Sequence, residues 1–342
     1  MKIAHEIVTL RTKNPFFIAR GGSSEYRVVR VTLTAPDGAT GWGEAAPSMY
    51  YGETADTVVN VLPLLAAAIA GSDGWSLEAM DHALAHAIRF NGSARAAVSA
   101  ALHDLMGKRL GVPVYRLWGL DPAAAPPSSF TVGIAPDEQT LRARVAEAAP
   151  YPVLKIKLGS NWDERIVRVV REMAPDKVLR VDANAAWTPK SCLRIIPLLQ
   201  ELGVEFVEQP LPPADLQGLR FVRERSALPI VADESCLVAA DIPKLAGVVD
   251  GINIKLAKCG GLREALRMIA TARAHDMLVM AGCMIESSLG ITAAAQFAPL
   301  LDCADLDGAA LVANDPYVGA TIDGGRIVLP QGSGLGVESR AG

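Results

Sequence analysis

The chain has 342 residues, of which 50% are hydrophobic, 20% are charged and only 5% are aromatic. This is the profile of a globular protein, and the length predicts two domains or one large barrel with an addition. Lys and Arg number 33 and Asp and Glu number 37, so the net charge is −4. Such a balance provides no basic surface for nucleic acid or for an anionic membrane.

The N-terminus, MKIAHEIVTLRTKNP, lacks the apolar core of a signal peptide, and Gly, Pro or charge interrupts the long apolar runs. We therefore expect a cytoplasmic protein. The five cysteines are odd in number, widely spaced and without a CxxC pair. This spacing favours reduced, packing cysteines over a zinc site or a disulfide framework.

The N-terminal part of the chain is predicted to be mixed α+β structure. Strand-like patterns cover residues 3–11 and 26–34 and a short stretch around Trp42. Ala-rich helical patterns follow at residues 54–70, 77–90 and 93–110. The segment 121–129, DPAAAPPSS, is the best candidate for a linker.

From Phe130 onward, short β-branched runs alternate with helical stretches. The spacing between run centres is about 25 residues, which suits one strand, one helix and two loops. The eight centres are Thr131, Lys155, Val181, Val207, Val231, Ile254, Met280 and Asp305. Eight such units predict a (β/α) barrel, compact enough that its last helix is missing or replaced. Beyond Asp307 the chain is rich in turn residues, and we expect it to return to the N-terminal domain.

Ionisable and amide side chains stand at the C-terminal ends of almost all the predicted strands, where barrels of this kind carry their function. Taken alone, a Lys-x-Lys strand is commonly a solvated edge, and an Asp at a strand end commonly caps a turn or helix. The whole set favours an active site, because charges inside a packed barrel need partners or a metal. These residues are Lys155, Lys157, Asp182, Asn184, Glu208, Asp233, Lys255, Glu286, Asp305 and Asp307.

Three of the carboxylates, Asp182, Glu208 and Asp233, end three consecutive predicted strands. They would converge oxygen ligands on one hard divalent cation. No His lies near these strand ends, so Mg²⁺ fits better than Zn²⁺. Its remaining positions would be left for water and for a substrate carboxylate.

Lys157 on the second strand and Lys255 on the sixth are expected to face each other across the barrel. Lys155 shares a strand face with Lys157, and a neighbouring cation lowers the pKa of a lysine that must act as a base. Two opposed bases can remove a proton from one face of a carbon and return one to the other. The pattern therefore predicts a 1,1-proton transfer next to a carboxylate, with a divalent cation stabilising the enediolate.

Five ordered motifs carry a family resemblance: LKIKLGS, RVDANAAW, FVEQP, ADES and INIKLAKCGG. Together with GWGEAAP and LHDLMGKRLGVPVYRLWG, they resemble the muconate-lactonizing-enzyme subgroup of the enolase superfamily, over the whole chain. The resemblance implies a modified TIM barrel, (β/α)7β, with an α+β capping domain formed by the N-terminal region and the C-terminal tail. The expected boundaries are 1–120 for the cap, 121–310 for the barrel and 311–342 for the returning segment.

The resemblance also implies roles for individual residues. Asp182, Glu208 and Asp233 would bind one Mg²⁺ per subunit. Lys157 would serve the S (L) configuration and Lys255 the R (D) configuration as the acid/base pair, with Lys155 as a supporting cation. Lys258 falls beyond the strand and is left outside the pair.

Substrate-binding candidates follow from a resemblance to dipeptide epimerases. Asp305-Leu306-Asp307 is similar to their Asp-x-Asp motif, where two carboxylates would hold a free α-ammonium group; the alternative is an Asx turn before Gly308. The stretch around Glu286, GCMIESSLGITAAAQF, is similar to the same enzymes. Arg20 stands where Ala-Glu epimerases carry a loop Arg for the side-chain carboxylate, although it could equally be solvated. Ser288 departs from the Lys that some of them have.

These features predict a Mg²⁺-dependent epimerase acting on the C-terminal residue of a dipeptide such as L-Ala-L-Glu. The alternatives are an N-acylamino acid racemase or o-succinylbenzoate synthase of the same subgroup, and a non-catalytic ligand-binding barrel. The expected partner is a small-molecule dipeptide, without nucleic acid or membrane. Members of this family often form symmetric assemblies, so a homo-oligomer is expected.

Overall fold

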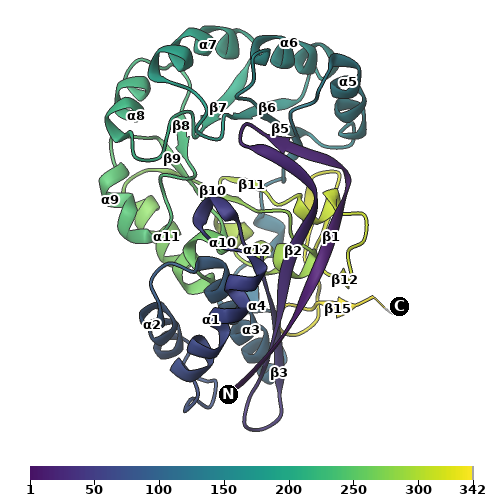
Figure 1. The fold of residues 1–342 in the computed structure, drawn as a ribbon, viewed down its shortest axis with the longest axis vertical. Coiled ribbons are helices and arrows are strands. Elements are labelled where there is room, and N and C mark those ends of the chain that lie inside the picture. Colours follow the sequence, from purple (N-terminus) through teal and green to yellow (C-terminus); the bar gives the residue numbers. More distant parts are fainter. Residues whose placement is uncertain (341–342) are drawn as a thin grey trace.

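The structure is a computed structural model that describes residues 1–340. It consists of a parallel barrel, in the upper half of Figure 1, and an antiparallel sheet with helices below it. No helix within residues 1–340 is long and apolar enough to cross a membrane. The five cysteines are free thiols, as the sequence predicts.

The lower part, which we call the cap, contains the three predicted strands and the three predicted helices. Its antiparallel sheet has the order β1-β2-β3 and consists of β1 (Lys2–Ile18), β2 (Gly21–Thr34) and β3 (Thr40–Ala45). The helices are α1 (Ala55–Ala68), α2 (Leu77–Ala87) and α3 (Gly92–Leu110). A separate hydrophobic core joins them, with Val31, Leu65 and Leu105 among its fully buried side chains.

The hairpin of β1 and β2 is longer than the sequence pattern indicates. The segment FFIARGGSS reads as a loop in the sequence, but both strands continue through it to a turn at Ala19 and Arg20. Gly21 next to the turn has φ +107°, which favours glycine. The hairpin reaches from the cap to the barrel (Figure 1), where Ile134 N–H donates to the carbonyl of Phe17.

Eight parallel strands form the barrel, and each predicted strand centre lies within one of them. They hydrogen-bond in chain order and are β4 (Phe130–Val132), β5 (Val153–Lys157), β6 (Val178–Asp182), β7 (Val204–Glu208), β8 (Ile230–Ala232), β9 (Gly251–Ile254), β10 (Leu278–Gly282) and β11 (Cys303–Asp305). β11 lies beside β4 and closes the barrel, as the hydrogen bond from the N–H of Ser129 to the carbonyl of Ala304 shows. The end of the segment expected as a linker is thus part of the barrel.

Helices follow the first seven barrel strands, and β11 leads into a short 3₁₀ turn, as the (β/α)7β prediction requires. The helices are α5 (Glu138–Glu147), α6 (Asp163–Met173), α7 (Pro189–Glu201), α8 (Leu216–Arg223), α9 (Ile242–Leu245), α10 (Leu256–Cys259), α11 (Leu262–Ala274) and α12 (Ser288–Ala295). Apolar residues that point outward from the strands, such as Leu154 and Ile156, pack in the main core. The alternate residues of the same strands are left for the interior.

The remaining elements are short. They are η1 (Met49–Tyr51), α4 (Val114–Leu117), η2 (Pro122–Ala124), η3 (Ala239–Asp241), η4 (Ala298–Leu300), η5 (Gly308–Leu311), β12 (Tyr317–Val318), β13 (Thr321–Asp323), β14 (Arg326–Val328) and β15 (Glu338–Ser339). The segment after η5 touches the cap: Asn314 bonds to the backbone of β1, and Leu335 N–H donates to Asp104 of α3. It also touches the barrel, because Ala320 N–H donates to Thr292 of α12.

The cap and the barrel meet at a buried carboxylate. Glu44 of β3 accepts hydrogen bonds from the backbone N–H and the hydroxyl of Ser287, just before α12. Burial raises the pKa of Glu44 to about 8, the Ser287 hydroxyl lowers it, and the nearby carboxylate of Glu286 raises it again. The seam therefore favours a protonated Glu44 at neutral pH.

β3 packs directly on α3, and the first prediction tests this contact. A Cβ at Gly43 would collide with the carbonyl oxygen of Ala97, so Gly43→Ala should destabilise the protein by at least about 2 kcal/mol through overpacking. Gly71 is the matched control, since a Cβ there would meet nothing within 4 Å. Urea unfolding of both variants measures the difference, and equal free energies of unfolding would contradict this packing.

The second prediction concerns pH. Because the pKa of Glu44 is about 8 when folded against an ordinary value of 4.5, the folded protein retains a proton that the unfolded chain releases between these values. Glu44 therefore costs stability progressively as pH rises through this window. Relative to the wild type, Glu44→Gln should gain at least about 1 kcal/mol between pH 5.5 and pH 8.5. Urea unfolding at both pH values checks this; a constant difference would argue against it.

Candidate active site

Three buried carboxylates converge at the C-terminal mouth of the barrel. Asp182 ends β6, Glu208 ends β7 and Asp233 directly follows β8. One carboxylate oxygen of each lies within 4.8 Å of the others, and all three side chains are buried. One oxygen of Glu208, Oε2, accepts no well-aligned hydrogen bond although Lys155 Nζ lies 2.7 Å away. A cluster of buried hard oxygen donors fits a divalent cation.

The pKa values of these acids differ with their neighbours. Burial raises the pKa of Glu208 to about 7, and the charge of Asp182 adds to this. Burial also acts to raise the pKa of Asp182, but Lys157 and Lys155 bring it down to about 2. The pKa of Asp233 lies well below its usual range because Lys255 and Lys258 outweigh its burial. The lysines thus keep two of the three acids ionised without a metal.

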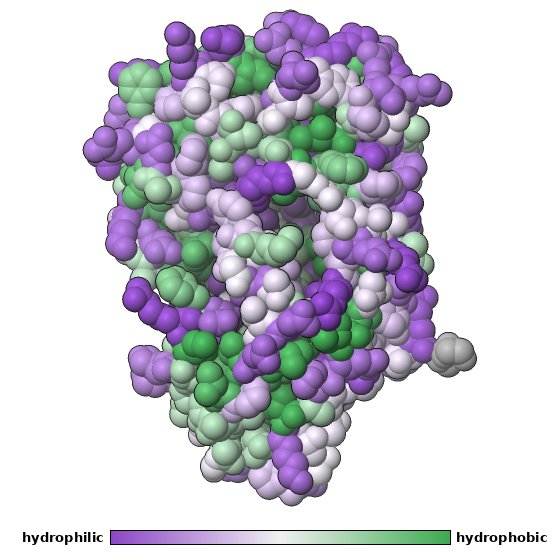
Figure 2. All heavy atoms as spheres, viewed as in Figure 1, coloured by the Kyte–Doolittle hydropathy of each residue, from purple (hydrophilic) through white to green (hydrophobic). Residues whose placement is uncertain are grey.

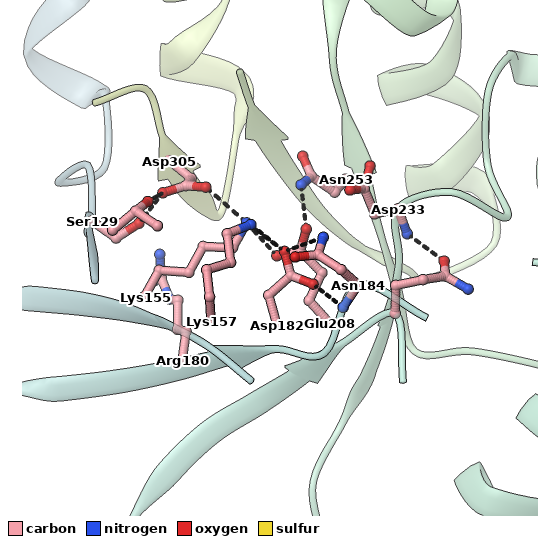
Figure 3. A network of polar contacts seen from close by, with 12 residues as sticks. Ser129, Lys155, Lys157, Arg180, Asp182, Asn184, Glu208, Asp233, Asn253 and Asp305 are labelled. Atoms are coloured by element: carbon pink, nitrogen blue, oxygen red, sulfur yellow. Dashed lines mark hydrogen bonds and ion pairs between the residues drawn. The ribbon is translucent and has the colours of Figure 1, made fainter. Parts of the chain in front are cut away.

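Lys155 and Lys157 of β5 point into the barrel toward the same carboxylate (Figure 3). Their Nζ atoms lie 3.4 Å and 2.7 Å from Oδ2 of Asp182, respectively. Lys155 also pairs with Asp305 Oδ2 at 2.8 Å. Burial lowers the pKa of Lys155, but Asp305 and Glu208 raise it well above its ordinary value. Its contacts neutralise carboxylates, and its expected effect on the pKa of Lys157 stays a prediction.

Lys255 lies on the other side of the carboxylate cluster, directly after β9. Its Nζ is 2.7 Å from Asp233 Oδ2. Burial lowers the pKa of this amine, but Asp233 raises it more, so that the pKa lies above the ordinary value. Lys157 and Lys255 therefore bind different members of one carboxylate cluster. Because β5 and β9 flank the three strands β6, β7 and β8 in the sheet, the two amines approach the cluster from its two sides.

Asp305 and Asp307 lie together between the first and last barrel strands. Asp305 Oδ1 accepts from the Ser129 hydroxyl at 2.6 Å, while Asp307 Oδ2 accepts from the N–H of Thr131 at 2.6 Å. Asp307 precedes η5, but its carboxylate does not cap that turn, so the alternative of an Asx turn is wrong. Burial raises the pKa of Asp307 to about 7, and Asp305 adds to this.

The hairpin brings Arg20 to the mouth of the barrel. Its guanidinium pairs with Glu234 Oε1 at 2.8 Å, donates to the carbonyl of Asn184 at 2.7 Å and lies 4.0 Å from the ring centre of Tyr50. Asn184 and Glu234 each lie within two residues of a carboxylate of the cluster. Beside the hairpin the surface is hollowed (Figure 2). The solvated alternative for Arg20 is wrong, because its side chain is only 31% exposed and is paired.

Glu286 and Ser288 lie farther out, at the seam with the cap. Glu286 Oε1 accepts from the N–H of Met284, and burial raises the pKa of Glu286 to about 7. The hydroxyl and N–H of Ser288 both donate to Asp315. Glu286 lines a small void together with Glu44 and Leu256. Its expected contact with substrate stays a prediction.

Two polar residues at the mouth, Asn253 and Gln209, are not among the residues that the sequence predicts for the site, and the partner of Lys258 was not predicted. Asn253 donates to Glu208 Oε1 at 2.7 Å, and the side-chain oxygen of Gln209 accepts from the N–H of Asp233 at 2.9 Å. Lys258 binds Asp233 Oδ1 at 2.5 Å. Asn253 stands two residues before Lys255 and so shares its strand face, a signal that was available. Gln209 has φ 32°, and this unusual backbone has no local sequence signal.

Comparisons with known proteins agree with this geometry. Residues 2–119 match the family model for the mandelate racemase/muconate lactonizing enzyme N-terminal domain, and residues 138–341 match the enolase C-terminal domain-like model. An L-Ala-D/L-amino acid epimerase from Maribacter sp. is 39% identical over 98% of this chain and 99% of its own. An L-Ala-D/L-Glu epimerase from Bacteroides thetaiotaomicron is 39% identical over 98% of this chain and 88% of its own.

A solved structure is similar over almost the whole chain. The dipeptide epimerase from Enterococcus faecalis V583, in complex with Mg and L-Leu-L-Tyr, has a TM-score of 0.93 and 33% identity, covering 98% of each chain. Both domains and the order of the motifs are thus accounted for by one family. The chain belongs to the mandelate racemase/muconate lactonizing enzyme family of the enolase superfamily.

Proposed function

We propose that this protein is a Mg²⁺-dependent dipeptide epimerase, which inverts the α-carbon of the C-terminal residue of a dipeptide. The observation that carries the proposal is the placement of Lys157 and Lys255 on opposite sides of one buried carboxylate cluster. Relatives that match the full length of the chain and are 39% identical to it are epimerases of this kind. A ligand-binding barrel without chemistry would not need two opposed amines.

Asp182, Glu208 and Asp233 are the proposed ligands of the ion. Their oxygen donors and their burial suit Mg²⁺, and the similar structure from E. faecalis contains Mg. When bound, the ion supplies positive charge for the second negative charge that a substrate carboxylate gains as its α-proton leaves. The barrel strands hold the three ligands rigidly, so little reorganisation is needed.

The two lysines are the proposed acid/base pair. Lys157 removes the α-proton of the S (L) substrate on one face, and Lys255 donates a proton to the opposite face of the same carbon; for the R (D) substrate the roles exchange. The pKa of Lys255, lowered by burial but raised more by Asp233, keeps it protonated at neutral pH, which is the state that donates. Lys155 stays paired with carboxylates and compensates part of the negative charge of the site.

The free α-ammonium group of the dipeptide is proposed to lie at Asp305 and Asp307. Both carboxylates are buried at the closing edge of the barrel, and Asp305 is linked to the cluster through Lys155. A cation arriving there would stabilise the ionised form of Asp307, whose pKa is otherwise raised by burial. An N-acyl substrate has no such cation.

Arg20 is proposed to bind the side chain of the C-terminal residue, and L-Ala-L-Glu is the leading substrate. A substrate carboxylate would compete with Glu234 for the guanidinium, since Arg20 pairs with that residue now. The names of the relatives differ in the second residue of the dipeptide: one is an L-Ala-D/L-Glu epimerase, one is an L-Ala-D/L-amino acid epimerase, and one was solved with L-Leu-L-Tyr. The second residue is therefore the part of the substrate that Arg20 and Glu234 decide.

The third prediction separates the two lysines. In D₂O, Lys255→Ala should still exchange the α-proton of L-Ala-L-Glu through Lys157, and Lys157→Ala should still exchange that of L-Ala-D-Glu through Lys255. Epimerisation should fall by a factor on the order of 10³ in either variant. Proton NMR of the α-position measures exchange and inversion together. Lys244→Ala, at an exposed position of α9, is the control, and inversion at the wild-type rate without either active-site lysine would refute the pair.

The fourth prediction tests the ammonium site and the racemase alternative. Asp307→Asn should lower kcat/KM for L-Ala-L-Glu about 100-fold, because a buried charge-assisted partner is lost. The activity toward an N-acyl-L-glutamate should change much less, so the ratio of the two is the measurement. Unchanged dipeptide activity in Asp305→Asn and Asp307→Asn would instead favour an N-acylamino acid racemase or an o-succinylbenzoate synthase.

A further inference from the structure

Lys258 is the most completely coordinated amine at the mouth of the barrel. It lies on α10, three residues after Lys255, and its side chain is fully buried. Its Nζ lies 2.5 Å from Asp233 Oδ1 and 2.6 Å from the carbonyl oxygen of the same residue. The carbonyl oxygens of Asn253 and Cys236 lie at 2.9 Å and 3.1 Å.

This coordination separates Lys258 from the proposed acid/base pair. An ammonium group has three N–H donors, and four protein oxygens already share them. Lys157 and Lys255 each have one carboxylate partner among residues 1–340. Those two amines can turn to a substrate by giving up one contact, whereas Lys258 would give up four.

These contacts of Lys258 restrict the conformation of Asp233. Its Oδ1 is bound by Lys258, its Oδ2 by Lys255 and its backbone N–H by the side chain of Gln209. Because Lys258 also grips the carbonyl of Asp233, the main chain and one side-chain oxygen are fixed by the same amine. The second oxygen, Oδ2, is then held in one direction, toward Lys255.

We propose that Lys258 is a positioning residue, which holds Asp233 so that Oδ2 serves the metal site while Lys255 is left free to move to the substrate. The inference rests on the proposed metal site and acid/base pair, but not on the identity of the dipeptide. Loss of Lys258 lets the carboxylate of Asp233 rotate and pair more fully with Lys255. Metal affinity and the Lys255 half-reaction should then suffer together.

A purely structural role is the competing explanation, since Lys258 also ties the carbonyls of Asn253 and Cys236 together. Two substitutions separate these roles. Lys258→Met removes all four contacts, whereas Lys258→Gln removes the charge but keeps N–H donors for the carbonyls. Lys244→Met and Lys244→Gln, at an exposed position of α9, are the matched controls. Urea unfolding without metal reports the structural contribution of each substitution.

The fifth prediction is a calorimetric titration of Mg²⁺ into these proteins without substrate. Both Lys258 variants should bind Mg²⁺ about 10–100-fold more weakly than the wild type, and the Lys244 variants should not change. If Lys258→Met does not fold, Lys258→Gln carries the test. A lower stability with unchanged Mg²⁺ affinity would overturn the proposal.

Rates of α-proton exchange test the second part of the proposal, the effect of Lys258 on Lys255. At saturating Mg²⁺, α-proton exchange that depends on Lys255 should slow about tenfold or more in Lys258→Gln relative to exchange that depends on Lys157, because only the former amine shares Asp233. Equal slowing of both exchanges would overturn this part. If the wild-type protein exchanges the α-proton of no dipeptide, the proposed function fails. The Mg²⁺ titration still tests whether Lys258 contributes to metal affinity.

Discussion

A charge inside a packed barrel needs a partner, and this requirement organises the whole mouth of the molecule. Three acids from neighbouring strands would repel one another if they were alone. Lys155, Lys157 and Lys255 compensate them at distances of 2.7–3.4 Å. The strands are fixed by their ladders and by the core outside, so neither set of charges can move apart. The three carboxylates can thus stay close together at the mouth of the barrel, where a divalent cation and a substrate carboxylate could bind.

The cap has a different task from the barrel. Its sheet carries a hairpin whose turn places Arg20 over Glu234 and Tyr50, and its third strand joins the barrel through Glu44 and Ser287. The groups proposed to react lie in or directly after barrel strands, whereas Arg20, which is proposed to meet the variable side chain of the substrate, belongs to a turn. A turn can change its sequence without disturbing a core. Under the proposed function, this division suits a family whose relatives are named for different dipeptides.

The sequence predicts the features that follow a regular pattern, which are the spacing of the barrel strands and the residues at their ends. The barrel strands recur at a regular spacing, and their end residues share one mouth, so the three acids and the lysine pair could be named before the structure. The hairpin tip was read as a loop because FFIARGGSS is rich in glycine and serine, which mark loops as readily as tight turns. The contacts of Glu234, Gln209 and Lys258 were not predicted, because a partner chosen across strands leaves no local pattern.

Lys255 and Lys258 show why proximity alone does not assign a chemical role. They stand three residues apart, both are buried, and both bind the carboxylate of Asp233. One amine holds a single carboxylate oxygen at the open side of the cluster, while the other is enclosed by one carboxylate and three carbonyl oxygens. A proton can be exchanged with a substrate only by an amine that has a contact to give up cheaply. The number of acceptors around each nitrogen, rather than its distance from Asp233, is therefore the basis on which we propose Lys255 for proton transfer and Lys258 for holding Asp233.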